Sequence, residues 1–274
     1  MKRAPAAAKI NLALVVGPTR DDGKHEVLTV LQRIDMVDRI EIEEATELRV
    51  DGFKDDTLVR TALERLAAAA GVEPEPRWRV KIEKHIPLAA GLGGGSSDAA
   101  TALRLANSSL ARPLPAADLH ALAAGIGADV PFFLEHGPQI GSGDGSDLEP
   151  LELPQDFWVV VLLPRDTVKS STADVYGAFD ARNGAAEWEE RRRALLDALA
   201  EVKTPSDLAA LPPNDLASSP LAAEIRVTGA FRADVSGAGP ALYGLYLDRR
   251  EADAAKRSLR RFGQTWLAPP AWYG

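Results

Sequence analysis

A glycine-dense segment at 87–97 reads Pro-Leu-Ala-Ala-Gly-Leu-Gly-Gly-Gly-Ser-Ser and runs directly into a helical pattern. Glycines adopt positive φ and let the backbone approach a ligand closely, so successive N–H groups can point at phosphate oxygens. The start of the following helix adds unpaired N–H groups and the positive end of a dipole. The segment therefore predicts a phosphate-binding loop, and the alternative is a flexible linker or an ordinary helix cap.

The loop matches neither of the two best-known phosphate-binding patterns. A Walker loop needs a lysine directly after its last glycine, and a dinucleotide fold places its glycines in the first strand-turn-helix unit. Here Ser96 and Ser97 follow the glycines, a third of the way along the chain. Both serines are N-cap candidates, and their hydroxyls could instead contact a phosphate or a metal ion held by it.

Two further segments carry side chains suited to chemistry. In the predicted strand 9–16, Lys9 and Asn11 share one face, which presents a cation beside an amide or is simply a solvated outer face. In the turn 126–133, Gly127 and Pro131 bring Asp129 into or beside apolar surroundings. We expect that carboxylate either to be tied up by backbone N–H groups or to take part in chemistry.

Composition limits the classes of protein that need to be considered. The chain has 274 residues, 46% of them hydrophobic, a net charge of −8 and no cysteine. It therefore has no overall basic surface for nucleic acid or anionic lipid, and no disulfide or thiolate chemistry. The four histidines are scattered, without the spacing of a zinc site. No apolar run could span a bilayer, so we expect a cytoplasmic protein with a small-molecule ligand and no membrane or nucleic-acid partner.

The predicted elements that must position these residues alternate between strands and helices. Strand patterns occur at 9–16, 27–34, 39–44, 47–53, 78–86, 157–163 and 241–247. Helical patterns run from Leu58 to a stop at Gly71, and at 96–111, 116–126, 172–181, 187–201, 217–225 and 250–262. Glycine-rich turns are predicted at 137–147 and 236–240. This alternation predicts an α+β protein in two parts, 1–150 and 151–274.

Four separated segments together resemble the GHMP small-molecule kinases: 8–12, 87–100, 127–133 and 236–240. The resemblance covers nearly the whole chain. It implies an N-terminal domain like ribosomal protein S5 and a C-terminal ferredoxin-like domain, with the active site between them. It also implies that Asp129 accepts the proton of an alcohol while Lys9 steadies the carboxylate and the developing alkoxide.

The same resemblance assigns ATP and Mg²⁺ to the glycine-dense loop. The implied ATP contacts are Pro87, Leu88, Ala89, Ala90, Gly91, Leu92, Gly93, Gly94, Gly95, Ser96 and Ser97, with Ser97 also touching the metal. Asn11 would hold the alcohol. The motifs are most similar to those of the subgroup whose alcohol carries a cytidine diphosphate and serves isoprenoid precursor synthesis. His25 and Tyr176 would then contact the cytosine.

Three positions depart from that subgroup's pattern. Lys24 stands where an aromatic residue normally stacks on the base, Thr57 replaces an asparagine near adenine, and Ala238 replaces a serine. A lysine stem covers a ring face without reproducing aromatic stacking, which is worth roughly 1–3 kcal/mol per base. Two alternatives therefore stay open: a related kinase for mevalonate, homoserine or another small alcohol, and a non-catalytic nucleotide-binding relative. The presence of both Lys9 and Asp129 disfavours the second.

Overall fold

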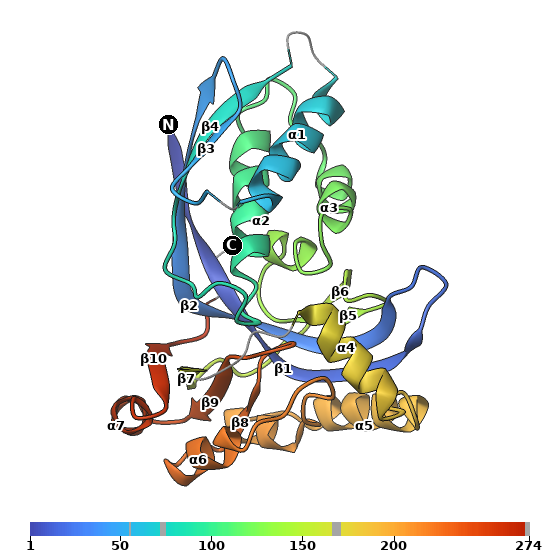
Figure 1. Ribbon diagram of the computed structural model, residues 1–274, viewed down its shortest axis with the longest axis vertical. Coiled ribbons are helices and arrows are strands. Elements are labelled where there is room, and N and C mark those ends of the chain that lie inside the picture. Colours follow the sequence, from blue (N-terminus) through green and yellow to red (C-terminus); the bar gives the residue numbers. More distant parts are fainter. Residues whose placement is uncertain (55, 72–74, 166–170, 272–274) are drawn as a thin grey trace.

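The computed structural model describes residues 1–54, 56–71, 75–165 and 171–271. Within these ranges the chain forms two sheets with helices packed against them, so the predicted α+β class is confirmed. Figure 1 shows the first sheet and its helices in the upper half of the molecule and the second sheet in the lower half.

Two long antiparallel strands, β1 (Lys2–Thr19) and β2 (His25–Ala45), organise the first sheet. The sequence predicted separate strands at 27–34 and 39–44, which are in fact parts of β2. Between them the register shifts, because Ala7 pairs with Val37 whereas Ala8 pairs with Ile34. The extra residues on β2 form a bulge, and a bulge bends a strand without ending it. The interval 35–38 between the two predicted strands contains this bulge.

The remaining strands of the first sheet are shorter. They are β3 (Arg49–Asp51), β4 (Arg77–Glu83), β5 (Gln139–Ser142) and β6 (Asp147–Pro150), in the order β3-β4-β2-β5-β6, with β1 paired to β2. The region 137–147, predicted as a turn, therefore contains strand β5 and the start of β6. Its turn is confined to the residues between them, where Gly143 and Gly145 both have positive φ.

The helices of the upper half pack on one another and on the first sheet. Helix α1 (Leu58–Ala70) buries apolar residues at helical spacing and ends at Gly71, which has a φ of 62°, as predicted. Helix α2 (Gly94–Asn107) begins two residues earlier than predicted and ends four earlier. Its N-cap is Gly93, so the prediction that Ser96 or Ser97 caps the helix is wrong. Helix α3 spans Ala116–Ala124, and a 3₁₀ turn follows at Pro131–Leu134.

The second sheet consists of β7 (Trp158–Pro164), β8 (Arg232–Val235), β9 (Leu242–Tyr246) and β10 (Gly263–Ala268), in the antiparallel order β10-β7-β9-β8. The apolar run at 157–163 correctly predicted an internal strand. Strands β8 and β10 were not predicted, and β10 carries Trp266 into the sheet. The associated helices are α4 (Thr172–Ala181), α5 (Trp188–Ala200), α6 (Leu221–Val227) and α7 (Arg249–Leu259), with a 3₁₀ turn at Pro205–Ala210.

One hydrophobic core joins the two halves. Ile10 and Leu12 of β1 belong to the same buried cluster as Val159 and Tyr243 of the second sheet. The Tyr243 hydroxyl also donates to the Leu12 carbonyl at 3.3 Å. Strand β1 therefore fixes the second sheet against the first. The division of the chain into two parts at residue 150 stays a prediction. Among the helices of the described ranges, none is both long enough and apolar enough to cross a bilayer.

Candidate active site

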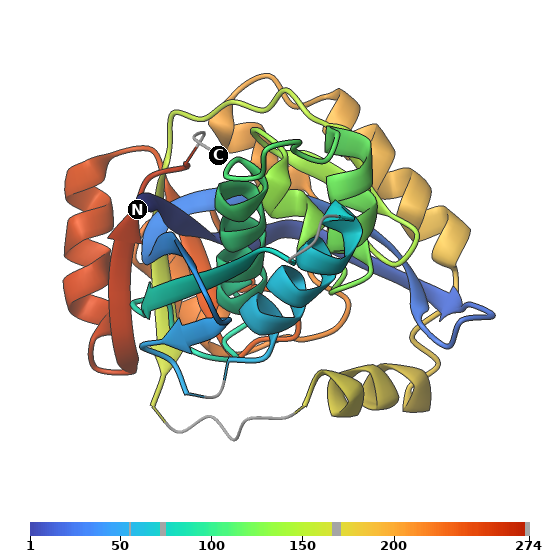
Figure 2. The ribbon, with the colours of Figure 1, turned by 90° about the horizontal axis from the view of Figure 1, so that it is seen from above.

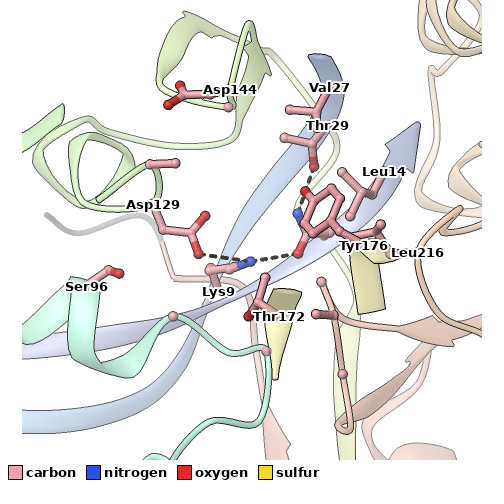
Figure 3. Close-up of a pocket in the computed structure, with 18 of the residues that line it drawn as sticks. Lys9, Leu14, Val27, Thr29, Ser96, Asp129, Asp144, Thr172, Tyr176 and Leu216 are labelled. Atoms are coloured by element: carbon pink, nitrogen blue, oxygen red, sulfur yellow. Dashed lines mark hydrogen bonds and ion pairs between the residues drawn. The ribbon is translucent and has the colours of Figure 1, made fainter. Parts of the chain in front are cut away.

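A cavity of about 390 Å³ lies where β1, β2, the glycine-dense loop, the turn at 236–240 and the start of α4 meet (Figure 3). It brings together residues that the sequence singled out in separate segments. The lining includes Lys9, Asn11, Ala89, Gly91, Gly93, Ser96, Asp129, Tyr176 and Gly237.

Lys9 supplies the cation of the cavity. Its side chain is only 5% exposed, and its Nζ lies 3.4 Å from Asp129 Oδ2 while donating to Asn11 Oδ1 at 2.7 Å. Asn11 in turn donates to Thr29 Oγ1 at 2.8 Å, and Thr29 donates to the Ala13 carbonyl at 2.9 Å. This chain of hydrogen bonds from β1 and β2 fixes the ammonium. The alternative of a solvated outer face is wrong for Lys9 and Asn11.

Asp129 approaches Lys9 from the turn after α3. Val130, Phe132 and Phe133 are buried in the hydrophobic cluster between the first sheet and its helices, and this anchors the turn. Val130 N also donates to the Gly127 carbonyl at 3.0 Å. The Asp129 side chain is 39% exposed, so it is open to the cavity as well as paired with Lys9. Figure 3 shows the carboxylate directed at the Lys9 ammonium. A proton acceptor at this place can reach a bound hydroxyl.

The glycine-dense loop is held by hydrogen bonds that its backbone carbonyls accept from other segments. The Leu92 carbonyl accepts from Lys9 N at 2.9 Å, the Ala90 carbonyl from Ala241 N at 3.0 Å, and the Gly91 carbonyl from Ser236 Oγ at 2.9 Å. Gly91 has a φ of 81°, and a Cβ there would lie 2.1 Å from the Ser236 carbonyl oxygen. Only glycine fits this contact.

The predicted loop contacts divide into those that face the cavity and those that do not. Ala89, Gly91, Gly93 and Ser96 line it, whereas Ala90 and Leu92 are buried in the core and Leu88 is exposed. Ser97 is 1% exposed within α2. Pro87, Gly94 and Gly95 are not part of the lining. The assignment of the whole loop to ATP stays a prediction.

The turn at 236–240 lies beside the glycine-dense loop and forms part of the cavity wall. Gly237, Ala238 and Gly239 all line it. Asn214 holds this turn by donating from Nδ2 to the carbonyls of Val235 at 3.0 Å and Gly237 at 2.6 Å. A Cβ on Gly237 would lie 3.5 Å from Lys9 Nζ. The turn connects two strands and also places backbone beside the cation.

Helix α4 closes one side of the cavity with Tyr176. In Figure 2 this helix lies apart from the main body, and its contacts with His25 place it beside the tip of the β1–β2 hairpin. The His25 ring stacks on Tyr176 with centroids 4.8 Å apart and contacts Asp180 Oδ1 at 2.8 Å. His25 therefore lies behind Tyr176 and is not part of the lining. Burial, with the charges of Asp129 and Asp144, raises the pKa of Tyr176 to about 12.

Several lining residues were missed by sequence reasoning. Asp144 comes from the turn between β5 and β6. It pairs with Lys24, which belongs to the turn between β1 and β2. Burial works against ionisation of Asp144, but hydrogen bonds from Lys24 and Ser146 lower its pKa. Thr29 and Thr172 also line the cavity. Nothing in the order of residues along the chain indicates these contacts. Thr57, which the sequence placed near adenine, lies at the start of α1 and is not part of the cavity lining.

Comparisons of the chain with family models and with known proteins agree on one family. The model of the GHMP kinases N terminal domain matches residues 57–137, and that of the GHMP kinases C terminal domain matches 217–265. A 4-diphosphocytidyl-2-C-methyl-D-erythritol kinase from Novosphingobium aromaticivorans is 35% identical over 276 residues, covering 99% of this chain and 90% of the relative.

Solved structures agree with the sequence relatives. A crystal structure of 4-(cytidine 5'-diphospho)-2C-methyl-D-erythritol kinase superposes with a TM-score of 0.79 at 31% identity, covering 100% of both chains. A crystal structure of mevalonate kinase gives a TM-score of 0.74 at 13% identity, covering 98% of this chain and 99% of that one. The second likeness concerns the fold alone.

Proposed function

The chain belongs to the GHMP kinases, and from that premise we propose that it transfers the γ-phosphoryl group of ATP to a hydroxyl of 4-diphosphocytidyl-2-C-methyl-D-erythritol, a step of non-mevalonate isoprenoid precursor biosynthesis. The observation that carries the proposal is the Lys9–Asp129 pair in a cavity walled by the glycine-dense loop. The choice of alcohol is supported by the names of the relatives that match over nearly the full chain.

The proposed chemistry assigns one proton transfer and one bond exchange. Asp129 accepts the proton of the substrate hydroxyl, and the oxygen forms a bond to the γ-phosphorus as the bond from that phosphorus to the β-phosphate oxygen breaks. The electron pair of the broken bond stays on the β-phosphate oxygen, and ADP is the leaving group. Lys9, oriented by Asn11, stabilises the charge on the attacking oxygen. Phosphoryl transfer needs positioning and charge stabilisation, and the buried hydrogen-bond chain behind Lys9 provides such positioning.

Mg²⁺ is part of the proposal. The ion normally keeps phosphate and water oxygens and takes only one or two protein ligands. The cavity offers one such protein ligand, the Ser96 hydroxyl, while Ser97, favoured by the sequence, is almost fully buried. When bound with the nucleotide, the ion would neutralise charge on the β and γ phosphates. Because the reaction consumes ATP, we also place the protein in the cytoplasm.

We assign the cytosine of the substrate to the end of the cavity near Tyr176 and Asp144. The hydroxyl that is phosphorylated is assigned to the end near Asn11. Tyr176 supplies an aromatic face there, backed by the His25 ring. Lys24 occupies the place of a second aromatic residue and instead neutralises Asp144. Stacking on one side and charge-assisted hydrogen bonding on the other would then select the nucleotide.

The proposal is tested by measuring ADP release with three alcohols: 4-diphosphocytidyl-2-C-methyl-D-erythritol, mevalonate and homoserine. We expect kcat/KM for the cytidine diphosphate substrate to exceed the others by at least about 100-fold. Activity on mevalonate or homoserine alone would assign the chain to a different alcohol. ATP binding without turnover of any of the three would instead favour a non-catalytic relative.

A further inference from the structure

Three charged side chains lie together behind the glycine-dense loop, in a cluster that the proposed reaction does not use. Lys84 follows β4, Asp38 belongs to β2 and Asp98 to α2. The Lys84 ammonium pairs with Asp38 and lies 2.7 Å from Asp98 Oδ2. Its side chain is 14% exposed, whereas the carboxylates of Asp38 and Asp98 are 0% and 2% exposed.

The cluster contacts both ends of the loop. Asp38 Oδ1 accepts hydrogen bonds from the backbone N–H groups of His85 and Ile86, the residues that lead into it. Asp98 lies near the start of α2, the helix into which the loop runs. Lys84 connects these two carboxylates, and a Cβ on Gly94 would lie 3.4 Å from its Nζ. One ammonium thus links the entry of the loop to its exit.

This arrangement leaves one of the two carboxylates incompletely paired. Two buried carboxylates share a single ammonium, and Asp98 Oδ1 has no hydrogen-bond partner among the described residues. Burial raises the pKa of Asp98 to about 7, against the attraction of Lys84. Buried charges with incomplete partners are often replaced by uncharged residues without loss of stability. What the second carboxylate does provide is a contact between Lys84 and the start of α2.

We infer that Lys84, held between Asp38 and Asp98, is a positioning residue for ATP that fixes the separation between the strand end and the helix start spanned by the loop. This inference rests on the proposed function, because it takes the loop to bind the triphosphate. Backbone N–H groups bind phosphate tightly only when they are already arranged, so loosening one end of the loop weakens nucleotide binding. The alcohol is assigned to the end of the cavity near Asn11, so its binding should be little affected.

The test is an Asp98→Ala variant of the full chain, with the ATP dissociation constant measured by calorimetry in the presence of Mg²⁺. We expect that constant to rise about tenfold, as for an indirectly transmitted loss of one hydrogen bond to a charged group. The KM for the alcohol should stay within about twofold. The Tm should change little, because Lys84 keeps Asp38 as its partner in this variant.

Two further variants separate positioning from general damage. Asp98→Asn keeps an oxygen that can accept from Lys84, so it should recover part of the lost ATP affinity. Thr101→Ala, a polar-to-alanine change at another buried position of α2, should leave the ATP dissociation constant unchanged.

An ATP dissociation constant within twofold of the unmodified value in Asp98→Ala would overturn the inference. So would a parallel rise of the ATP constant and the alcohol KM accompanied by a lower Tm, because that pattern describes a merely structural residue. Failure of the unmodified protein to bind ATP would instead remove the proposed function, and the inference with it.

Discussion

Lys9 Nζ lies 3.4 Å from Asp129 Oδ2, and the two residues differ sharply in exposure. The lysine is buried and held by Asn11, whereas the aspartate is 39% exposed and faces the cavity. The pair is therefore asymmetric: one partner is fixed, and the other is open to a ligand. This asymmetry matches a division between a charge stabiliser and a proton acceptor.

Asp129→Asn should lower kcat by about 10²–10⁴-fold, the usual contribution of a general base, because the amide cannot accept the hydroxyl proton. The variant is nearly isosteric, so the ATP dissociation constant should change less than about threefold. Steady-state kinetics and calorimetry measure the two quantities. Asp21→Asn, a change at an exposed carboxylate outside the cavity lining, serves as the control. Near-normal kcat in Asp129→Asn would remove Asp129 from this role.

Gly91→Ala should raise the KM for ATP by at least about tenfold, because the new Cβ would lie 2.1 Å from the Ser236 carbonyl oxygen and must displace the loop. Gly71→Ala is the matched control, since Gly71 also has positive φ but no atom of the described residues within 4 Å of a Cβ. That control should lower the Tm through backbone strain of about 1 kcal/mol and leave the KM alone. Equal effects of both changes on the KM would contradict the special position of Gly91.

Tyr176→Ala should raise the KM for the cytidine diphosphate substrate by about 5- to 150-fold, equivalent to a lost base stacking of roughly 1–3 kcal/mol. Tyr176→Phe keeps the ring that stacks on His25 and should change the KM by less than about threefold. Initial rates at varied substrate and saturating ATP give both values. If the alanine variant raised only the KM for ATP, the base would have to bind elsewhere.

Lys24→Met should raise the pKa of Asp144, which can be followed by carboxyl NMR titration. Lys24 and Ser146 hold this pKa below its usual value of about 3.9, so the ion pair contributes fully above that pH. The contribution is lost as the pH falls through the lower folded-state value. Because Lys24 is largely exposed, the effect on stability should be small, about 0–1 kcal/mol at neutral pH. An unchanged pKa of Asp144 would show that Lys24 does not interact with it in solution.

The sequence was informative wherever a segment carried its own signal. The spacing of Val59, Ala62 and Leu66 predicted α1, and Gly71 predicted its end, because helix burial and left-handed capping are local properties. The loop at 87–97 was recognisable for the same reason. Lys9 and Asn11 were identified as candidates from their residue types, but their burial depends on the turn at 236–240, far away in the chain.

Features that depend on pairing between distant segments were the ones missed. The bulge at 35–36 looked like a break in the strand because its cause is the register against β1. Strand β8 is only four residues long, and Asp144 enters the cavity because the β5–β6 hairpin folds beside β2. The N-cap of α2 was misassigned because Gly93 takes a left-handed conformation, which serines two and three residues later do not reveal.

The core shared by β1 and the second sheet limits how this enzyme can be divided. A fragment that stopped at residue 150 would leave Ile10 and Leu12 without their partners, and Gly91 without the Ser236 hydroxyl. Neither half therefore buries all of its apolar surface within itself. A chimaera that combined halves of two relatives would have to take β1 and strands β7 to β10 from the same relative. A single crossover point in the chain cannot achieve this, because β1 lies at the start of the chain and β7 to β10 lie in its second half.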